Sequence, residues 1–369
     1  MNTTFEPNFA VPPGDTLAET LETLGMSQAE LAERMGRPLK TINEIIAGKA
    51  MITSDTGLQL EKVLGVPAAF WTNRERLYRD TLARRRETSE LEQQLGWLST
   101  MPVRELVRIG WISAVTEPVG QLRAVLSFFG VAGVEEWRAV WESPGAAFRQ
   151  SRAFEANRGA TAAWLRKGQI EGQKLDCAPF DEAIFTEALR HLRRYTTKEP
   201  AEFVPVLRDR CAQGGVAVVF VPPLSGVRAY GVSRWLHSAK ALIQLSLRGR
   251  TDDHLWFTFY HEAGHALKHG KRAVFVEEGE VLALARDPRE AEADVFAREW
   301  LIPSSDYEQF CTKGDFSIAA IRRFAGRIGV APGIVAGRLQ HDRKVPFSRA
   351  NRLKRRFDFG NGRRPKANH

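Results

Sequence analysis

Two histidines and a glutamate at positions 261–265 form the pattern in this chain most able to do chemistry: His261-Glu262-Ala263-Gly264-His265. The segment lies in a helical pattern from about residue 252 to residue 269. Side chains four residues apart leave a helix on the same side, so both histidines can reach one metal ion. Glu262 can take a proton from a water whose pKa zinc has lowered to about 7. The pattern predicts zinc-dependent attack on a carbonyl, with Glu262 as general base.

A catalytic zinc site needs a third protein ligand and an open fourth position. The predicted helix from 288 to 301 offers Glu290 and Asp294, four apart on one face. We predict Glu290 as the third ligand. Asp294 would accept the other ring N–H of a ligand histidine and fix its tautomer. Glu292 lies elsewhere around this helix and is the rival ligand.

The other histidines nearby are predicted to have supporting or structural roles. His269 continues the series, but it lies about 12 Å along the helix from His261 and cannot share the same ion. We expect it to support the site or the helix end. His237 and His254 are isolated histidines near the predicted sheet, where a structural role is favoured over oxyanion stabilisation.

The elements that must position these residues form a small α+β domain. Residues 216–221 and 241–247 are apolar or β-branched runs bounded by Gly, Pro or Arg, which predicts two buried strands. Residues 88 to about 210 show helical patterns, with Trp137, Trp141, Phe180 and Phe185 as expected core.

Four short helical patterns fill the first 66 residues. Ser27 with Glu30 forms a capping-box pattern before a helix that Gly36 ends. A third helix from about Pro38 to Ala47 would be the one that enters the DNA major groove. Its predicted DNA contacts are Arg37, Lys40, Thr41, Asn43 and Lys49. The alternative is a helical bundle that binds only protein.

Residues 12–71, PPGDTLAETLETLGMSQAELAERMGRPLKTINEIIAGKAMITSDTGLQLEKVLGVPAAFW, resemble the HigA antitoxin family within the XRE and lambda-repressor type of helix-turn-helix. The resemblance implies a homodimer on operator DNA, repression of its own operon and a possible RelE-like toxin partner.

The region from about 145 to 340 resembles the ImmA/IrrE family of zinc metallopeptidases. The segments that carry this resemblance include GGVAVVFVPP, DDHLWFTFYHEAGHALKHG and EAEADVFAREWLIP. It implies a gluzincin-like fold, a Zn2+ cofactor and limited cleavage of a regulatory protein, often a repressor. The expected fold class is therefore multidomain, with an all-α helix-turn-helix bundle followed by an α+β zincin-like metallopeptidase domain.

Charge and composition divide the chain further. Residues 1–75 carry a net charge of −4 and residues 341–369 carry +8, out of +9 for the whole chain. The expected domains are 1–75 for DNA binding, 76–144 as a helical linker, 145–340 for the peptidase and 341–369 as a basic, disordered tail. Three scattered cysteines exclude a disulfide framework. The N-terminal segment lacks a signal-peptide pattern, so we expect a cytoplasmic protein without membrane contact.

Two functions of different classes follow. The first is a DNA-binding transcriptional regulator carrying a zinc endopeptidase that cleaves a regulatory protein. The second is a HigA-like antitoxin and autorepressor that binds a toxin and keeps a structural, non-catalytic zinc site. The intact Glu262 favours the first, because a structural zinc site needs no general base. Nucleic-acid hydrolysis is disfavoured, because the carboxylate cluster of a two-metal site is missing.

Overall fold

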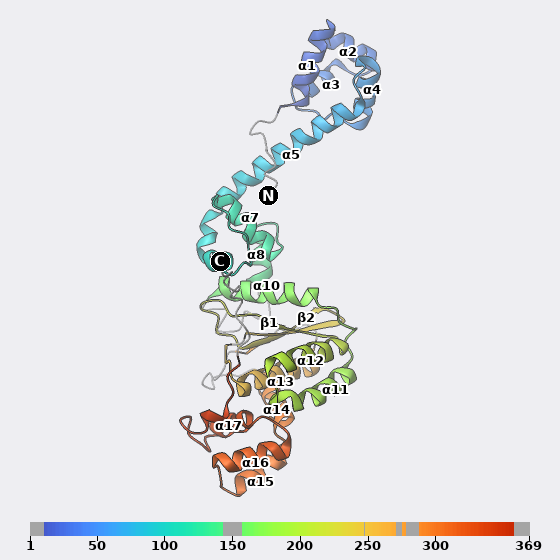
Figure 1. The fold of residues 1–369 in the computed structure, drawn as a ribbon. Coiled ribbons are helices and arrows are strands. Elements are labelled where there is room, and N and C mark those ends of the chain that lie inside the picture. Colours follow the sequence, from blue (N-terminus) through green and yellow to red (C-terminus); the bar gives the residue numbers. More distant parts are fainter. Residues whose placement is uncertain (1–10, 143–156, 247, 271–274, 278–287, 358–369) are drawn as a thin grey trace, which may run out of the picture. The chain divides into compact units, whose positions relative to one another are not determined.

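The computed structural model describes residues 11–142, 157–246, 248–270, 275–277 and 288–357 (Figure 1). The chain divides into two compact units, Met1–Gly96 and Trp97–His369. The domain boundary expected at residue 75 falls inside a continuous helix of the first unit. The one expected at residue 145 lies outside the described residues.

The first unit is a helical bundle with one apolar core. Ser27 caps its second helix by accepting a hydrogen bond from the Glu30 N–H, and Gly36 ends that helix in the left-handed conformation. The core centres on the buried Trp71 and on leucines and isoleucines from the shorter helices. The helices are α1 (Pro13–Leu24), α2 (Gln28–Met35), α3 (Leu39–Ile46), α4 (Ser54–Leu64) and α5 (Ala68–Glu92).

The second unit begins with helices that precede a sheet. Of the aromatic residues expected in the core, Trp137, Trp141 and Phe185 are buried, whereas Phe180 is only partly buried and packs against the core. This part comprises η1 (Leu95–Thr100), α6 (Val103–Arg108), α7 (Pro118–Phe129), α8 (Val134–Trp141), α10 (Arg158–Lys174), α11 (Glu182–Arg193), η3 (Arg194–Thr197) and α12 (Pro200–Gln213).

The sheet has four strands in the order β1-β3-β2-β4, formed by β1 (Val216–Phe220), β2 (Gly231–His237), β3 (Lys240–Leu245) and β4 (Phe275–Glu277). β1 runs parallel to β3, with Val216 opposite Ala241, and β2 runs antiparallel to both β3 and β4. In Figure 1, α10 lies over one face of the sheet, and α11, α12 and α13 (Asp252–Lys268) lie on the other side.

The remaining helices complete a layer next to α13. They are α14 (Pro288–Leu301), α15 (Ser304–Thr312), α16 (Ile318–Ile328), α17 (Pro332–His341) and η4 (Asn351–Leu353). The predicted fold class, a helical bundle followed by an α+β domain, is confirmed. None of the helices in the described ranges is long and apolar enough to cross a bilayer.

Two of the four strands follow the sequence prediction. β1 and β3 are apolar runs buried on both faces, so their composition predicts them. β2 was missed because its sequence, GVSRWLH, begins with glycine and mixes polar and apolar residues without a clear period of two. Hairpin pairing with β3 and longer-range pairing with β4, rather than its own composition, define this strand.

Residues 341–357 pack on the second unit, and this corrects the expectation of a disordered tail beginning at residue 341. Lys354 Nζ lies 2.6 Å from Asp253 Oδ2, and Arg355 Nε donates to Asp252 Oδ2 over 3.3 Å. Phe357 is buried in the core. Basic residues of the expected tail are thus held by two aspartates at the start of α13, and residues 358–369 lie outside the described residues.

Asp252 is expected to make the folded protein less stable as the pH rises. Burial and the neighbouring Asp253 raise its pKa from 3.8 to about 6, with Arg355 acting in the opposite direction. Between these pH values the folded state holds a proton that the unfolded state has released, so stability falls as pH rises. Relative to Asp252→Asn, the wild type is expected to lose roughly 2.4 kcal/mol of unfolding free energy between pH 4 and 7. Urea unfolding of both proteins across this range measures the difference, and parallel pH curves would contradict it.

Candidate metal centre

Three predicted ligand side chains converge between α13 and α14. Their donor atoms, from His261, His265 and Glu290, all lie within 4.8 Å of one another. The two histidine Nε2 atoms are 3.0 Å apart. Glu290 Oε2 lies 3.2 Å from His261 Nε2, and Glu290 Oε1 lies 3.5 Å from His265 Nε2.

These separations fit a zinc ion. Tetrahedral zinc with bonds of about 2.0–2.1 Å keeps its ligand atoms about 3.3 Å apart. Two imidazole nitrogens and one carboxylate are also the donor set of catalytic zinc sites, which leave a fourth position open. The side chains present can therefore hold a metal ion such as zinc.

The ionisation of the ligands suits metal binding. Burial alone would raise the pKa of Glu290, but hydrogen bonds with His261 and His265 outweigh burial and lower the pKa to about 2. Burial lowers the pKa of His265 to about 4, with Glu290 acting in the opposite direction. At neutral pH the carboxylate is ionised and this imidazole is neutral, as metal ligands must be.

The ligand histidines make further contacts on the side away from the ligand cluster. His261 Nδ1 lies 3.0 Å from Asp294 Oδ1, the contact expected for fixing the tautomer of the ring. His265 Nδ1 lies 2.8 Å from His269 Nδ1, and His269 Nε2 lies 3.1 Å from Glu292 Oε2. The structure thus places Glu290 at the cluster. Glu292, the rival ligand, lies against His269.

Replacing Glu290 and Glu292 by glutamine, one at a time, should show which of the two carboxylates binds the metal. Glu290→Gln removes a donor atom and is expected to lower zinc affinity by more than about 100-fold, above the usual effect of losing an outer hydrogen-bond partner. Glu292→Gln keeps all three donors and should stay within about tenfold of wild type. Competition for zinc with a chromogenic chelator measures both affinities. Zinc loss in Glu292→Gln alone would mean that Glu292 is the ligand.

Glu262 lies in a tight space between α13 and β2. Its side chain is fully buried. A Cβ at Gly231, the first residue of β2, would come within 2.8 Å of Glu262 Oε1 and 2.6 Å of Thr258 Cγ2. Gly231 is therefore a candidate site position that sequence reasoning missed. A glycine inside a strand is a signal for close approach of another group, but the strand itself had to be recognised first.

A second glycine, Gly264, lets α14 approach the metal-centre helix. A Cβ at Gly264 would come within 3.1 Å of the Phe296 ring. Ala293 and Ala297, on the facing side of α14, are fully buried. Small residues on both helices keep them close, which brings Glu290 to the two histidines.

The predicted DNA-contact residues lie on or beside α3 in the first unit. Ile42 and Ile45 form the buried side of this helix. Among the predicted contacts, Thr41 and Arg37 are half-buried, and Arg37 donates a hydrogen bond to Gln59 of α4. The other three are exposed to solvent: Lys40, Asn43 and Lys49.

Comparison with known families agrees with this division of the chain. A family model described as helix-turn-helix matches residues 17–71. The model of peptidase family M78, described as an IrrE N-terminal-like domain, matches residues 217–340, a range that contains every residue of the metal centre. The chain joins a helix-turn-helix domain to a peptidase M78 domain. The helix-turn-helix and IrrE-like assignments made from the sequence are thereby confirmed.

Relatives of the helix-turn-helix domain include a regulator and two antidote proteins. The chain is 33% identical over 61 residues to YddM of Escherichia coli K12, an uncharacterized HTH-type transcriptional regulator. The match covers 16% of this chain and spans 65% of that relative's length. A solved addiction-module antidote of the HigA family from Coxiella burnetii is 33% identical, over 23% of this chain and 92% of its own, with a TM-score of 0.22. A putative plasmid-maintenance antidote from Nostoc punctiforme is 32% identical, over 22% and 91%, with a TM-score of 0.22.

Proposed function

We propose that this chain is a DNA-binding transcriptional regulator whose M78 domain is a zinc-dependent endopeptidase that cleaves a regulatory protein. One observation carries the proposal. The three donor atoms of His261, His265 and Glu290 lie together in a peptidase-family domain, and the buried Glu262 lies directly next to the first of them in sequence.

The residues of the M78 domain would have separate roles in peptide hydrolysis: metal binding, proton transfer and positioning. His261, His265 and Glu290 would hold zinc, which when bound lowers the pKa of a water molecule to about 7 and polarises a carbonyl. Glu262 would accept the proton of the attacking water and deliver it to the amide nitrogen that leaves. Asp294 holds the His261 ring in one orientation through Nδ1. Gly231 keeps room for the Glu262 carboxylate.

Cleavage in a native extract tests the peptidase proposal. Purified zinc-loaded protein is expected to create new protein N-termini in an extract of the host cell. A chelator should abolish them, and re-addition of zinc should restore them. The same N-termini with and without chelator would contradict the proposal.

The helix-turn-helix domain would read operator DNA with the exposed side of α3. Asn43→Ala is expected to lose about 1–3 kcal/mol of binding and to relax specificity at one base pair, because an asparagine amide can pair with an adenine edge. Lys40→Ala should weaken all sequences alike and reduce the salt dependence, as loss of a phosphate contact does. Selection from random DNA duplexes followed by binding titrations measures both. Lys62→Ala, an exposed lysine on α4, is the control. Equal losses in all three variants would contradict the role of α3.

The antitoxin alternative makes a different prediction for the same general base. A protein that only sequesters a toxin should neutralise it equally well as wild type or as Glu262→Gln, because sequestration needs no proton transfer. Growth rescue in cells that express a toxin encoded next to this chain distinguishes the two. If the rescue depends on cleavage, Glu262→Gln should fail to rescue growth.

A further inference from the structure

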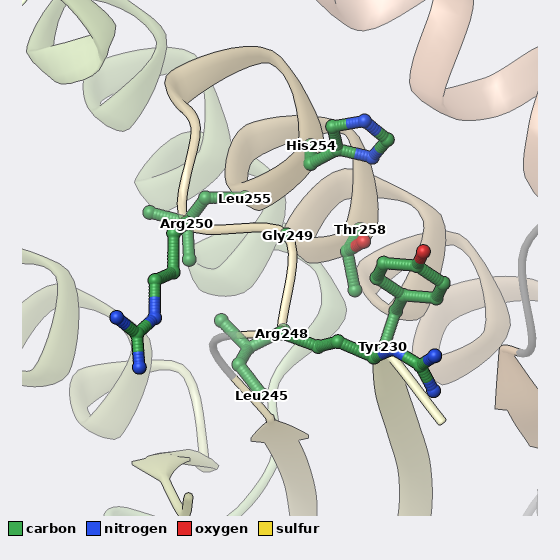
Figure 2. Close-up of a pocket in the computed structure, with 8 residues that line it drawn as sticks. All are labelled: Tyr230, Leu245, Arg248, Gly249, Arg250, His254, Leu255 and Thr258. Atoms are coloured by element: carbon green, nitrogen blue, oxygen red, sulfur yellow. The ribbon is translucent and has the colours of Figure 1, made fainter. Parts of the chain in front are cut away.

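A second concave site lies beside the N-terminal half of α13 (Figure 2). It is enclosed by the residue before β2, the end of β3, the loop 248–250 and the first turns of α13. The part that encloses a water-sized group has a volume of about 10 Å³, and the unfilled space of about 280 Å³ between the lining residues includes solvent at the open side. Leu245 and Leu255, both buried, form an apolar lining, so the site combines an apolar interior with an open side.

A cation and two stacked rings border this pocket. The Arg248 guanidinium lies over the Tyr230 ring, 5.7 Å from its centroid, and Arg248 Nη1 donates to Val227 O over 3.2 Å. The Tyr230 ring stacks on His254, with centroids 5.9 Å apart and planes 13° apart. Figure 2 shows Arg250 pointing away from this group. Within the ranges that the structure describes, no carboxylate forms an ion pair with Arg248.

Two residues of the pocket lie on the same face of α13 as the proposed general base. His254, Thr258 and Glu262 are spaced four apart on α13 and so form one row. Gly231, next to Tyr230, meets both Thr258 and Glu262. Thr258 lies about 6 Å and His254 about 12 Å along the helix from Glu262. An extended peptide advances about 3.3 Å per residue, so this span corresponds to about two to four residues of a bound substrate.

We propose that this pocket is a specificity subsite that binds an acidic side chain of the substrate polypeptide, about two to four residues from the cleaved bond. The inference rests on the proposed peptidase function. Arg248 presents a guanidinium fork that suits a carboxylate, and the leucines accept the methylene groups of an aspartate or glutamate. The Tyr230 ring and the Val227 carbonyl fix the guanidinium in place, which limits the entropy lost on binding.

Cleavage-site profiling tests this subsite with a library of peptides prepared from a whole proteome. Wild-type sites are expected to be enriched roughly five- to tenfold in Asp or Glu at one position in the stated window. Arg248→Glu should lose this enrichment and favour Lys or Arg there. Arg322→Glu, which reverses an exposed arginine on α16, should keep the wild-type profile. An Arg248→Glu profile equal to wild type would overturn the subsite.

Binding without cleavage separates this inference from the peptidase proposal. Two pools of fluorescein-labelled eight-residue peptides, randomised except for one central Glu or one central Lys, are titrated by anisotropy against Glu262→Gln. The Glu pool should bind roughly five- to tenfold more tightly, and adding Arg248→Glu should remove the difference. Charge-selective binding with no cleavage by wild type would retain the pocket as a binding site for acidic side chains and reject the peptidase. Cleavage by wild type, with equal binding of both pools, would support the peptidase and reject the subsite.

Discussion

Glu262→Gln is expected to reduce proteolysis by roughly 10²–10⁴-fold, the range that a positioned general base contributes. Glutamine has nearly the same shape, so it fits the space that Gly231 leaves beside α13. It cannot accept a proton from water at neutral pH. Because Glu262 lies outside the ligand cluster of His261, His265 and Glu290, zinc content should stay at wild-type level.

The measurement pairs a cleavage rate with a metal analysis. The expected result is a variant that unfolds at the wild-type temperature, contains one zinc per chain and has almost no activity. Loss of zinc together with activity would assign Glu262 to the ligand set. Full activity in the variant would mean that no general base acts at this position.

Gly231→Ala is expected to lower the cleavage rate by roughly 100-fold, the effect of moving a catalytic group by about 1 Å. The new methyl carbon would start 2.8 Å from Glu262 Oε1 and 2.6 Å from Thr258 Cγ2, so the carboxylate must move. The three atoms nearest to this methyl carbon belong to Thr258 and Glu262, and none belongs to the proposed zinc ligands. Zinc affinity should therefore change little.

A control glycine separates this effect from general destabilisation. Gly326 lies in α16, and a methyl group added there would meet no other atom within 4 Å. Gly326→Ala should therefore keep activity and gain up to about 1 kcal/mol of stability. Thermal unfolding and cleavage rates of both variants make the comparison. An active Gly231→Ala protein would show that the Glu262 position tolerates displacement.

The cluster of His261, His265 and Glu290 was largely predictable because its patterns are local. His261 and His265 share one helix face, and so do Glu290 and Asp294, and helix periodicity alone reveals both pairs. The choice between Glu290 and Glu292 was harder, because it depends on how α14 rotates against α13. That rotation follows from the packing of Gly264 on Phe296, a contact between residues 32 positions apart.

The parts that sequence reasoning missed depend on distant contacts. β2 is defined in part by its pairing with β4, which lies about 40 residues later in the chain. Residues 354–357 look like a charged tail in isolation, yet their partners Asp252 and Asp253 lie about a hundred residues earlier. Gly231 has a functional meaning only once β2 is placed beside Glu262. No local pattern carries this information.

The most direct test of the central claim is a comparison of new protein N-termini in host cells expressing wild type or Glu262→Gln at equal levels. The M78 site should produce at least one cleavage that occurs only with wild type, in a protein that controls transcription. Identical sets of N-termini under both normal and stressed growth, with both proteins loaded with zinc, would contradict a peptidase role for His261, Glu262 and His265.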